Sequence, residues 1–166
     1  MSALEAWRRQ KDEFMRRPDS PLPAEERLRF TGLRYFPANQ ALALDLDLDT
    51  NVPHDPITME TSDSRQRTYR RAGRITFTVD GQAALLNVYE DDHGYFLPFR
   101  DATGGKESYP AGRYLEPDMV NGTLHVDFNY AYNPYCAYSE RYSCPLPPAE
   151  NWLPVPIRAG EMKFKD

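Results

Sequence analysis

The chain has 166 residues, a net charge of -5 and a mean hydropathy of -0.72, which is typical of one compact domain with a polar surface. Its basic residues form pairs rather than a run, and no apolar stretch approaches the roughly 20 residues that span a bilayer. We therefore expect a single domain over residues 1–166 that binds no nucleic acid and does not enter a membrane.

The N-terminal segment is predicted to be helical. Ser2 and Glu5 have the spacing of a capping box, and apolar residues recur at helical spacing as far as Met15. We expect a helix over residues 3–17, ended by the prolines that begin at Pro18. Charges lie where a secretory signal needs apolar residues, and there are only two cysteines. A cytoplasmic location with free thiols is therefore expected.

The period of the apolar residues changes after the helix. Leucines alternate with Ala43 and with aspartates over residues 42–49, which predicts a half-buried strand. Further strands are predicted over residues 74–79, 82–89, 95–99, 109–115 and 123–130, separated by turns that include Asp80-Gly81, residues 91–94 and Asn121-Gly122. About seven strands joined mostly by short turns predict an antiparallel β-sandwich or β-barrel over residues 29–130.

The last part of the chain, residues 131–166, has a different composition. Its prolines are too frequent for a regular helix or strand, and its tyrosines are too numerous for a disordered tail. We expect an ordered proline- and tyrosine-rich segment packed over the sheet. The tyrosines of residues 130–142 either form a stacking platform for a ring-bearing ligand or pin this segment to the sheet.

Two long motifs carry a resemblance to a known family. They are the stretch from Asp127-Phe-Asn-Tyr-Ala-Tyr-Asn-Pro to Tyr138, and the stretch from Ser143-Cys-Pro-Leu-Pro-Pro to Ala159-Gly-Glu161. The chain resembles the prokaryotic domain-of-unknown-function family sixteen eighty-four, and the likeness extends upstream through residues 99–115 and 30–37. The resemblance implies a stand-alone β-rich domain and no particular activity.

The chain departs from the pattern of that family at three positions. Tyr130 and Trp152 stand where arginine is common, and Pro110 stands where glycine is common. If those arginines bind an anion in relatives, this chain binds a different ligand or uses other cations, namely Arg100, Arg113 and Arg158.

His125 and Asp127 share one face of a predicted strand, because side chains alternate along it. A functional interpretation makes them an acid–base pair facing a cavity. A structural interpretation places His125 on an ordinary solvent face and lets Asp127 and Asn129 fix the backbone of the following loop. The second interpretation is favoured, since any half-buried strand has a polar face.

Two further motifs have both a chemical and a structural interpretation. The turn after Arg100-Asp101 contains Gly104-Gly105, which can present amides to an anion, with Arg113 as a second cation, or can simply close a loop. Cys136 and Cys144 lack the close spacing of a zinc or redox motif. They are expected to be packed thiols, with a nucleophilic Cys136 or a disulfide as the alternatives.

The leading functional hypothesis is a small-molecule-binding β-domain with a pocket between the polar face of the sheet and the tyrosine-rich segment. Its ligand-binding candidates are Arg100, Asp101, Arg113, Asp127, Asn129, Tyr130, Tyr132 and Asn133. The alternatives are an enzyme that uses His125 with Asp127 or Cys136, and a structural or homodimeric module that associates through the strand of residues 42–49. The sequence assigns no metal, cofactor or catalytic residue, and a bound flavin is suggested only by analogy between folds.

Overall fold

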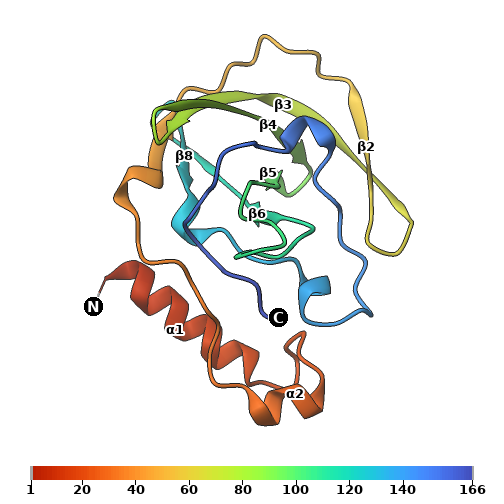
Figure 1. Cartoon of the computed structure of the whole chain (residues 1–166). Coiled ribbons are helices and arrows are strands. Elements are labelled where there is room, and N and C mark those ends of the chain that lie inside the picture. Colours follow the sequence, from red (N-terminus) through yellow and green to blue (C-terminus); the bar gives the residue numbers. More distant parts are fainter. Residues whose placement is uncertain (1, 166) are drawn as a thin grey trace.

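The computed structural model describes residues 2–165 as a mainly β protein with a helical N-terminus (Figure 1). The helices are α1 (Ala3–Met15) and α2 (Ala24–Arg29), and the strands are β1 (Ala43–Leu46), β2 (Pro56–Glu60), β3 (Gln66–Val79), β4 (Gln82–Asp91), β5 (Gly94–Phe99), β6 (Arg113–Leu115), β7 (Asp118–Val120) and β8 (Thr123–Asp127). They form two antiparallel sheets, one in the order β1-β8-β7 and the other in the order β2-β3-β4-β5-β6. The fold is sandwich-like, as the alternating pattern predicted.

Two predicted turns connect paired strands. Val79 pairs with Gln82, and the intervening Asp80 and Gly81 have φ angles of +50° and +80°. Asn121-Gly122 joins β7 to β8 in the same way, with φ angles of +51° and +86°. Both connections have the positive φ values of a type I′ turn, for which Asn-Gly and Asp-Gly are suited. These two hairpins are therefore confirmed.

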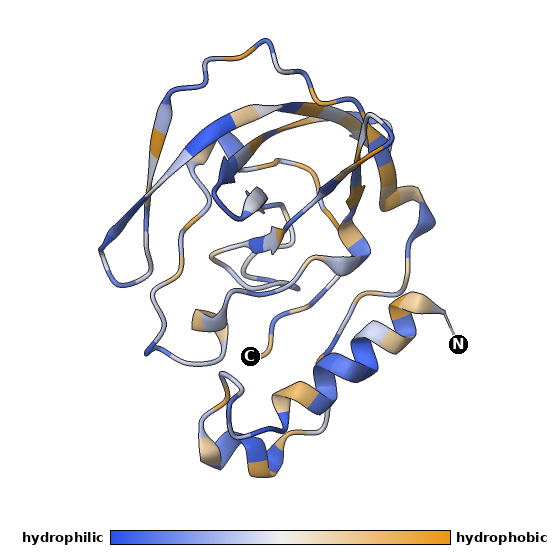
Figure 2. Ribbon diagram, turned by 180° about the vertical axis from the view of Figure 1, so that it is seen from behind, coloured by the Kyte–Doolittle hydropathy of each residue, from blue (hydrophilic) through white to orange (hydrophobic). Residues whose placement is uncertain are grey.

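Several strands differ from the sequence prediction. The structure has eight strands in residues 2–165 instead of about seven, and β2 and β7 match no predicted range. The hairpin of β2 and the first half of β3 is exposed and has little apolar alternation. Figure 2 shows mainly hydrophilic colours at this hairpin. The strand predicted from residue 109 begins only at Arg113, since Gly112 has a φ of +109°. The strand predicted to residue 130 ends at Asp127 and continues as a 3-10 turn.

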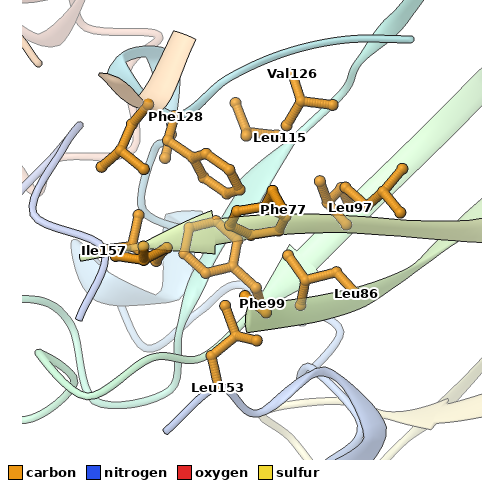
Figure 3. Close-up of a cluster of buried hydrophobic side chains, with 14 of the residues drawn as sticks. Phe77, Leu86, Leu97, Phe99, Leu115, Val126, Phe128, Leu153 and Ile157 are labelled. Carbon is orange, nitrogen blue, oxygen red and sulfur yellow. The ribbon is translucent and has the colours of Figure 1, made fainter. Parts of the chain in front are cut away.

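The main core lies between the two sheets. The ring of Phe128 packs 5.3 Å from those of Phe77 and Phe99, measured between ring centres. Leu153 and Ile157 from the C-terminal segment belong to the same cluster (Figure 3). Both sheets and the proline-rich segment thus share one hydrophobic core, and that segment is part of the packed structure rather than an appendage.

Helix α1 packs beside the sheets and contributes to a second apolar cluster. Ser2 caps its first turn by accepting a hydrogen bond from the Glu5 amide at 3.1 Å, as the capping box predicts. The helix ends at Met15, two residues earlier than predicted, and Met15 is buried with Leu22 and Tyr138. Within residues 2–165 neither helix combines the length and the apolar character needed to span a bilayer.

Candidate functional site

The C-terminal segment is held to the sheet by polar side chains as well as by its apolar residues. Strands β4 and β5 pair only near their shared turn, and the buried Asn151 bridges them beyond that point. Its Nδ2 donates to the carbonyl oxygens of Asn87 and Pro98 at 2.9 and 2.8 Å, and its Oδ1 accepts from the Asn87 amide at 2.9 Å. Asn151 therefore replaces ladder hydrogen bonds where the two strands diverge.

Asp101 and Arg113, two of the sequence candidates, form a buried ion pair with 3.2 Å between Oδ1 and Nη2. The guanidinium of Arg113 also donates to the carbonyl oxygens of Ile157, Ala159 and Glu161. Asp101 Oδ2 accepts from the Ile157 amide at 2.7 Å. The pair thus anchors residues 157–161, and its charges face the protein's own backbone.

Glu161 is a fully buried carboxylate at the end of this anchored segment. Its Oε2 lies 3.0 Å from Nζ of Lys11 on α1 and accepts from the Asn133 amide at 2.8 Å. Its Oε1 accepts from the hydroxyl of Tyr138. Burial raises the pKa of Glu161, while the Lys11 ammonium and the Asn133 amide oppose that rise. This cluster joins α1, the tyrosine-rich segment and the C-terminal segment.

The remaining polar candidates on β8 and after it are dispersed. His125 Nδ1 lies 2.9 Å from Asp45 on the neighbouring strand, and both side chains are exposed. Asp127 instead accepts hydrogen bonds from the Asn129 amide and side chain, at 3.0 and 2.8 Å. The buried Asn129 exchanges two hydrogen bonds with the backbone of Asn39. This arrangement matches the structural interpretation, in which Asp127 and Asn129 fix a loop.

Tyr130 and Asp127 border a surface hollow of about 300 Å³ next to β8. The Tyr130 ring packs edge-on against Trp7 of α1, with 5.0 Å between the ring centres. The hollow also contains Glu116, Asp118 and His125, so it is predominantly acidic. Arg100 lies away from it, 5.0 Å from the centre of the Trp152 ring. The eight sequence candidates therefore do not meet in one pocket.

A second groove, which we name the aromatic groove, lies between the turn end of the β2–β3 hairpin and the tyrosine-rich segment. Figure 1 shows the course of the β2–β3 hairpin and of this segment. Its volume is about 300 Å³ and its wall is mostly apolar. The lining residues are Arg67, Tyr114, Tyr132, Pro134, Tyr135, Tyr142, Ser143, Cys144 and Pro145. A backbone bridge between Thr61 and Pro145 and a hydrogen bond of 2.9 Å from the Ser62 amide to the Cys144 carbonyl hold its two sides together.

The tyrosines of the aromatic groove pack in two edge-to-face pairs. The ring centres of Tyr114 and Tyr132 are 5.9 Å apart, and those of Tyr135 and Tyr142 are 5.2 Å apart. Tyr132 donates its hydroxyl proton to Glu116 and Tyr114 donates to the Pro145 carbonyl, so these two hydroxyls are satisfied within the protein. Burial raises the pKa of both phenols, which keeps them neutral. These two tyrosines consequently present neutral rings to the groove.

Arg67 supplies the positive charge at the groove. Its Nη2 donates to the Ser143 carbonyl at 2.5 Å, and among the ion pairs of the described residues Arg67 takes part in none. Arg67 and Tyr114 are not recognisable as site residues from the sequence, because each lies on a strand far from the tyrosine-rich segment in the chain. Long-range backbone contacts, such as the bridge between Thr61 and Pro145, bring Arg67 to that segment.

The two cysteines, eight positions apart in sequence, lie close together, and Cys144 lines the aromatic groove. Both are free thiols, and the Cys136 amide donates to Cys144 Sγ at 3.3 Å. No group of three or more His, Cys, Asp or Glu side chains in residues 2–165 is arranged to hold a metal ion.

Comparison with known proteins places the chain in a family. Residues 28–162 match the family described as "Protein of unknown function (DUF1684)". The solution NMR structure of an uncharacterized protein from gene locus rrnAC0354 of Haloarcula marismortui is similar, with 39% sequence identity and a TM-score of 0.71. That similarity covers 96% of this chain and 91% of the other, while no curated protein matches. The family expected from the motifs is confirmed, and the chain belongs to the DUF1684 proteins of unknown function.

Proposed function

We propose that this protein is a small-molecule-binding domain and that the aromatic groove is its ligand site. The observation that carries the proposal is the convergence of four tyrosine rings and two prolines on one mostly apolar groove. Ligand sites are usually apolar hollows with a few placed polar groups, and a volume of about 300 Å³ is at the small end of their range.

The chemistry of the groove favours a flat ring that carries a carboxylate. Tyrosine faces and edges bind aromatic rings through offset and edge-to-face contacts. Arg67 is exposed and takes part in no ion pair with the described residues. One of its N–H groups donates to the Ser143 carbonyl, and a guanidinium has further donors with which it can bind a carboxylate at the groove. Because the side chains of Asp101, Arg113 and Asn129 bind backbone groups elsewhere, we assign them to the support of the fold, while Tyr132 forms part of the groove wall.

Titration calorimetry with naphthoate, a two-ring carboxylate, tests this proposal. We expect saturable binding to the wild-type protein. Arg67→Gln is expected to weaken it about tenfold, because a charge-assisted hydrogen bond is lost. Tyr135→Ala removes a ring that is 42% exposed and packs on Tyr142, and is expected to weaken binding by about 2- to 10-fold.

Two controls separate recognition from general damage to the fold. Arg70→Gln removes a second exposed arginine of β3, which pairs with Glu90 at 3.8 Å, and should leave binding unchanged. Neutral naphthamide should bind wild type and Arg67→Gln equally, because it has no charge for Arg67 to recognise. The proposal fails if naphthoate does not bind, or if Arg70→Gln weakens binding as much as Arg67→Gln does.

A further inference from the structure

The packing of the tyrosine-rich segment brings together the only two cysteines of the chain. Cys136 lies in the 3-10 turn Tyr135–Ala137, and Cys144 precedes the bridge between Pro145 and Thr61. The Cys136 amide donates to Cys144 Sγ at 3.3 Å, so the Cys144 sulfur lies against the backbone of Cys136. This proximity of two free thiols is what an intramolecular disulfide requires.

The surroundings of the two sulfur atoms are unequal. Cys136 Sγ lies 3.5 Å from the hydroxyl oxygen of Tyr109. The polar neighbours Cys144, Tyr109 and Ser62 lower the pKa of Cys136 to about 6 against the effect of burial. The interaction with Cys136 and burial raise the pKa of Cys144, although the nearby Arg67 opposes that rise.

Cys136, the thiol with the lowered pKa, is also the more exposed of the two. Cys136 is partly exposed, whereas Cys144 is 7% exposed. Burial raises the pKa of Tyr109, so its phenol keeps the proton that it donates toward Cys136. A solute therefore meets an ionised sulfur at Cys136 first, with a protonated thiol beside it. This is the arrangement of an attacking thiol and a resolving thiol.

We propose that Cys136 and Cys144 form a redox-active thiol pair that reduces low-molecular-weight disulfides. The Cys136 thiolate attacks one sulfur of a disulfide RSSR, forms a mixed disulfide and expels one thiolate, RS⁻. Cys144 then loses its proton, attacks the Cys136 sulfur and expels the second RS⁻. One protein dithiol and one RSSR give one protein disulfide and two RSH, so the two electrons and two protons balance.

Intact-mass spectrometry of the full chain treated with bis(2-hydroxyethyl) disulfide tests the proposal. The wild-type protein should lose two hydrogens and retain no reagent. Cys144→Ser should accumulate a stable mixed disulfide at Cys136, because a serine hydroxyl cannot resolve the adduct. Cys136→Ser should react about tenfold more slowly or less, since the remaining thiol is buried and protonated.

The pH dependence of adduct formation in Cys144→Ser distinguishes an activated thiol from one that is merely exposed. An activated Cys136 reaches half of its maximal rate near pH 6, in accord with its pKa of about 6, whereas an ordinary thiol does so at about pH 8.5. Tyr109→Phe should move this midpoint upward. Far-UV circular dichroism checks that each variant is folded.

Peptide mapping of the oxidised wild-type protein is a second test, which needs no variant. Peptide mapping after oxidation should find Cys136 linked to Cys144 within one chain. Persistent mixed disulfides, or disulfides between chains, in the wild-type protein would contradict the pairing. In the variants, equal rates for Cys136→Ser and Cys144→Ser would contradict the assignment of the attacking thiol.

Discussion

Replacing Arg113 with methionine is expected to lower the free energy of unfolding by about 3–5 kcal/mol, a large fraction of the total stability of a domain. The substitution leaves the Asp101 carboxylate buried without its cation and three backbone carbonyl oxygens of residues 157–161 without a donor. Urea unfolding followed by circular dichroism measures the change. We expect the C-terminal segment to be the first part of the chain to lose protection.

Arg158→Gln is the matched control for this prediction. Arg158 lies on the same segment, but its ion pair with Glu107 is exposed, and solvent screens such pairs. The urea midpoint of Arg158→Gln should stay close to that of the wild type. If Arg113→Met unfolds at the same urea concentration as Arg158→Gln, then the buried pair does not anchor the segment.

Replacing Glu161 with alanine is expected to have a comparable effect, about 3–5 kcal/mol of lost stability. It leaves the Lys11 ammonium, whose side chain is 15% exposed, without a counter-charge, and it leaves the Tyr138 hydroxyl and the Asn133 amide without an acceptor. Lys11→Met should be milder, because the Asn133 amide and the Tyr138 hydroxyl still bind the carboxyl of Glu161. Loss of the ammonium also removes a group that opposes the rise of the pKa of Glu161, so this carboxyl can take up a proton. Urea unfolding of the two variants side by side checks this order, and the reverse order would contradict it.

The raised pKa of Glu161 also predicts how stability changes with pH. In the folded chain this carboxyl holds its proton above its ordinary pKa of 4.5, so the folded state binds more protons than the unfolded state does. The contribution of Glu161 to the free energy of unfolding therefore falls as the pH rises above that value. The stability difference between wild type and Glu161→Gln, which does not titrate, should decrease between about pH 4 and pH 7. A constant or growing difference would contradict the direction of the shift.

Much of the fold follows from local sequence signals. Asp80-Gly81 and Asn121-Gly122 require positive φ angles, and the leucines of residues 42–49 alternate toward the core, so these elements are visible without a structure. The hairpin of β2 and the first half of β3 could not be predicted from the sequence, because most of its side chains face solvent. Its strands are stabilised by backbone pairing, which leaves little trace in the pattern of apolar residues.

The candidate site is less visible in the sequence than the fold is. Residue type suggested that Asp101, Arg113 and Asn129 bind a ligand, but such side chains equally satisfy buried backbone groups. Which role applies depends on long-range contacts, such as those from Arg113 to residues 157–161. Arg67 shows the converse case. It becomes a candidate because long-range contacts between the turn of the β2–β3 hairpin and residues 142–146 bring it to the aromatic groove.

Anchoring and function are connected through the tyrosine-rich segment. Tyr138 holds this segment to Glu161, and residues on either side of it supply Cys136, Cys144 and groove rings. A fixed segment keeps the rings and the sulfur atoms in place before a ligand arrives, and such preorganisation reduces the entropy lost on binding. Loss of the Glu161 anchor should therefore weaken the proposed ligand binding as well as the stability of the fold.

The central claim, that the aromatic groove is the ligand site, is tested most directly by titrating naphthoate into the isotopically labelled full chain and following its backbone amide resonances by NMR. The account predicts saturable shifts concentrated at Arg67, Tyr114, Tyr132, Tyr135, Tyr142 and Cys144, with little change along β8. Shifts concentrated instead around Asp127 and Tyr130, in the acidic hollow, would contradict it, and so would the absence of any saturable shift.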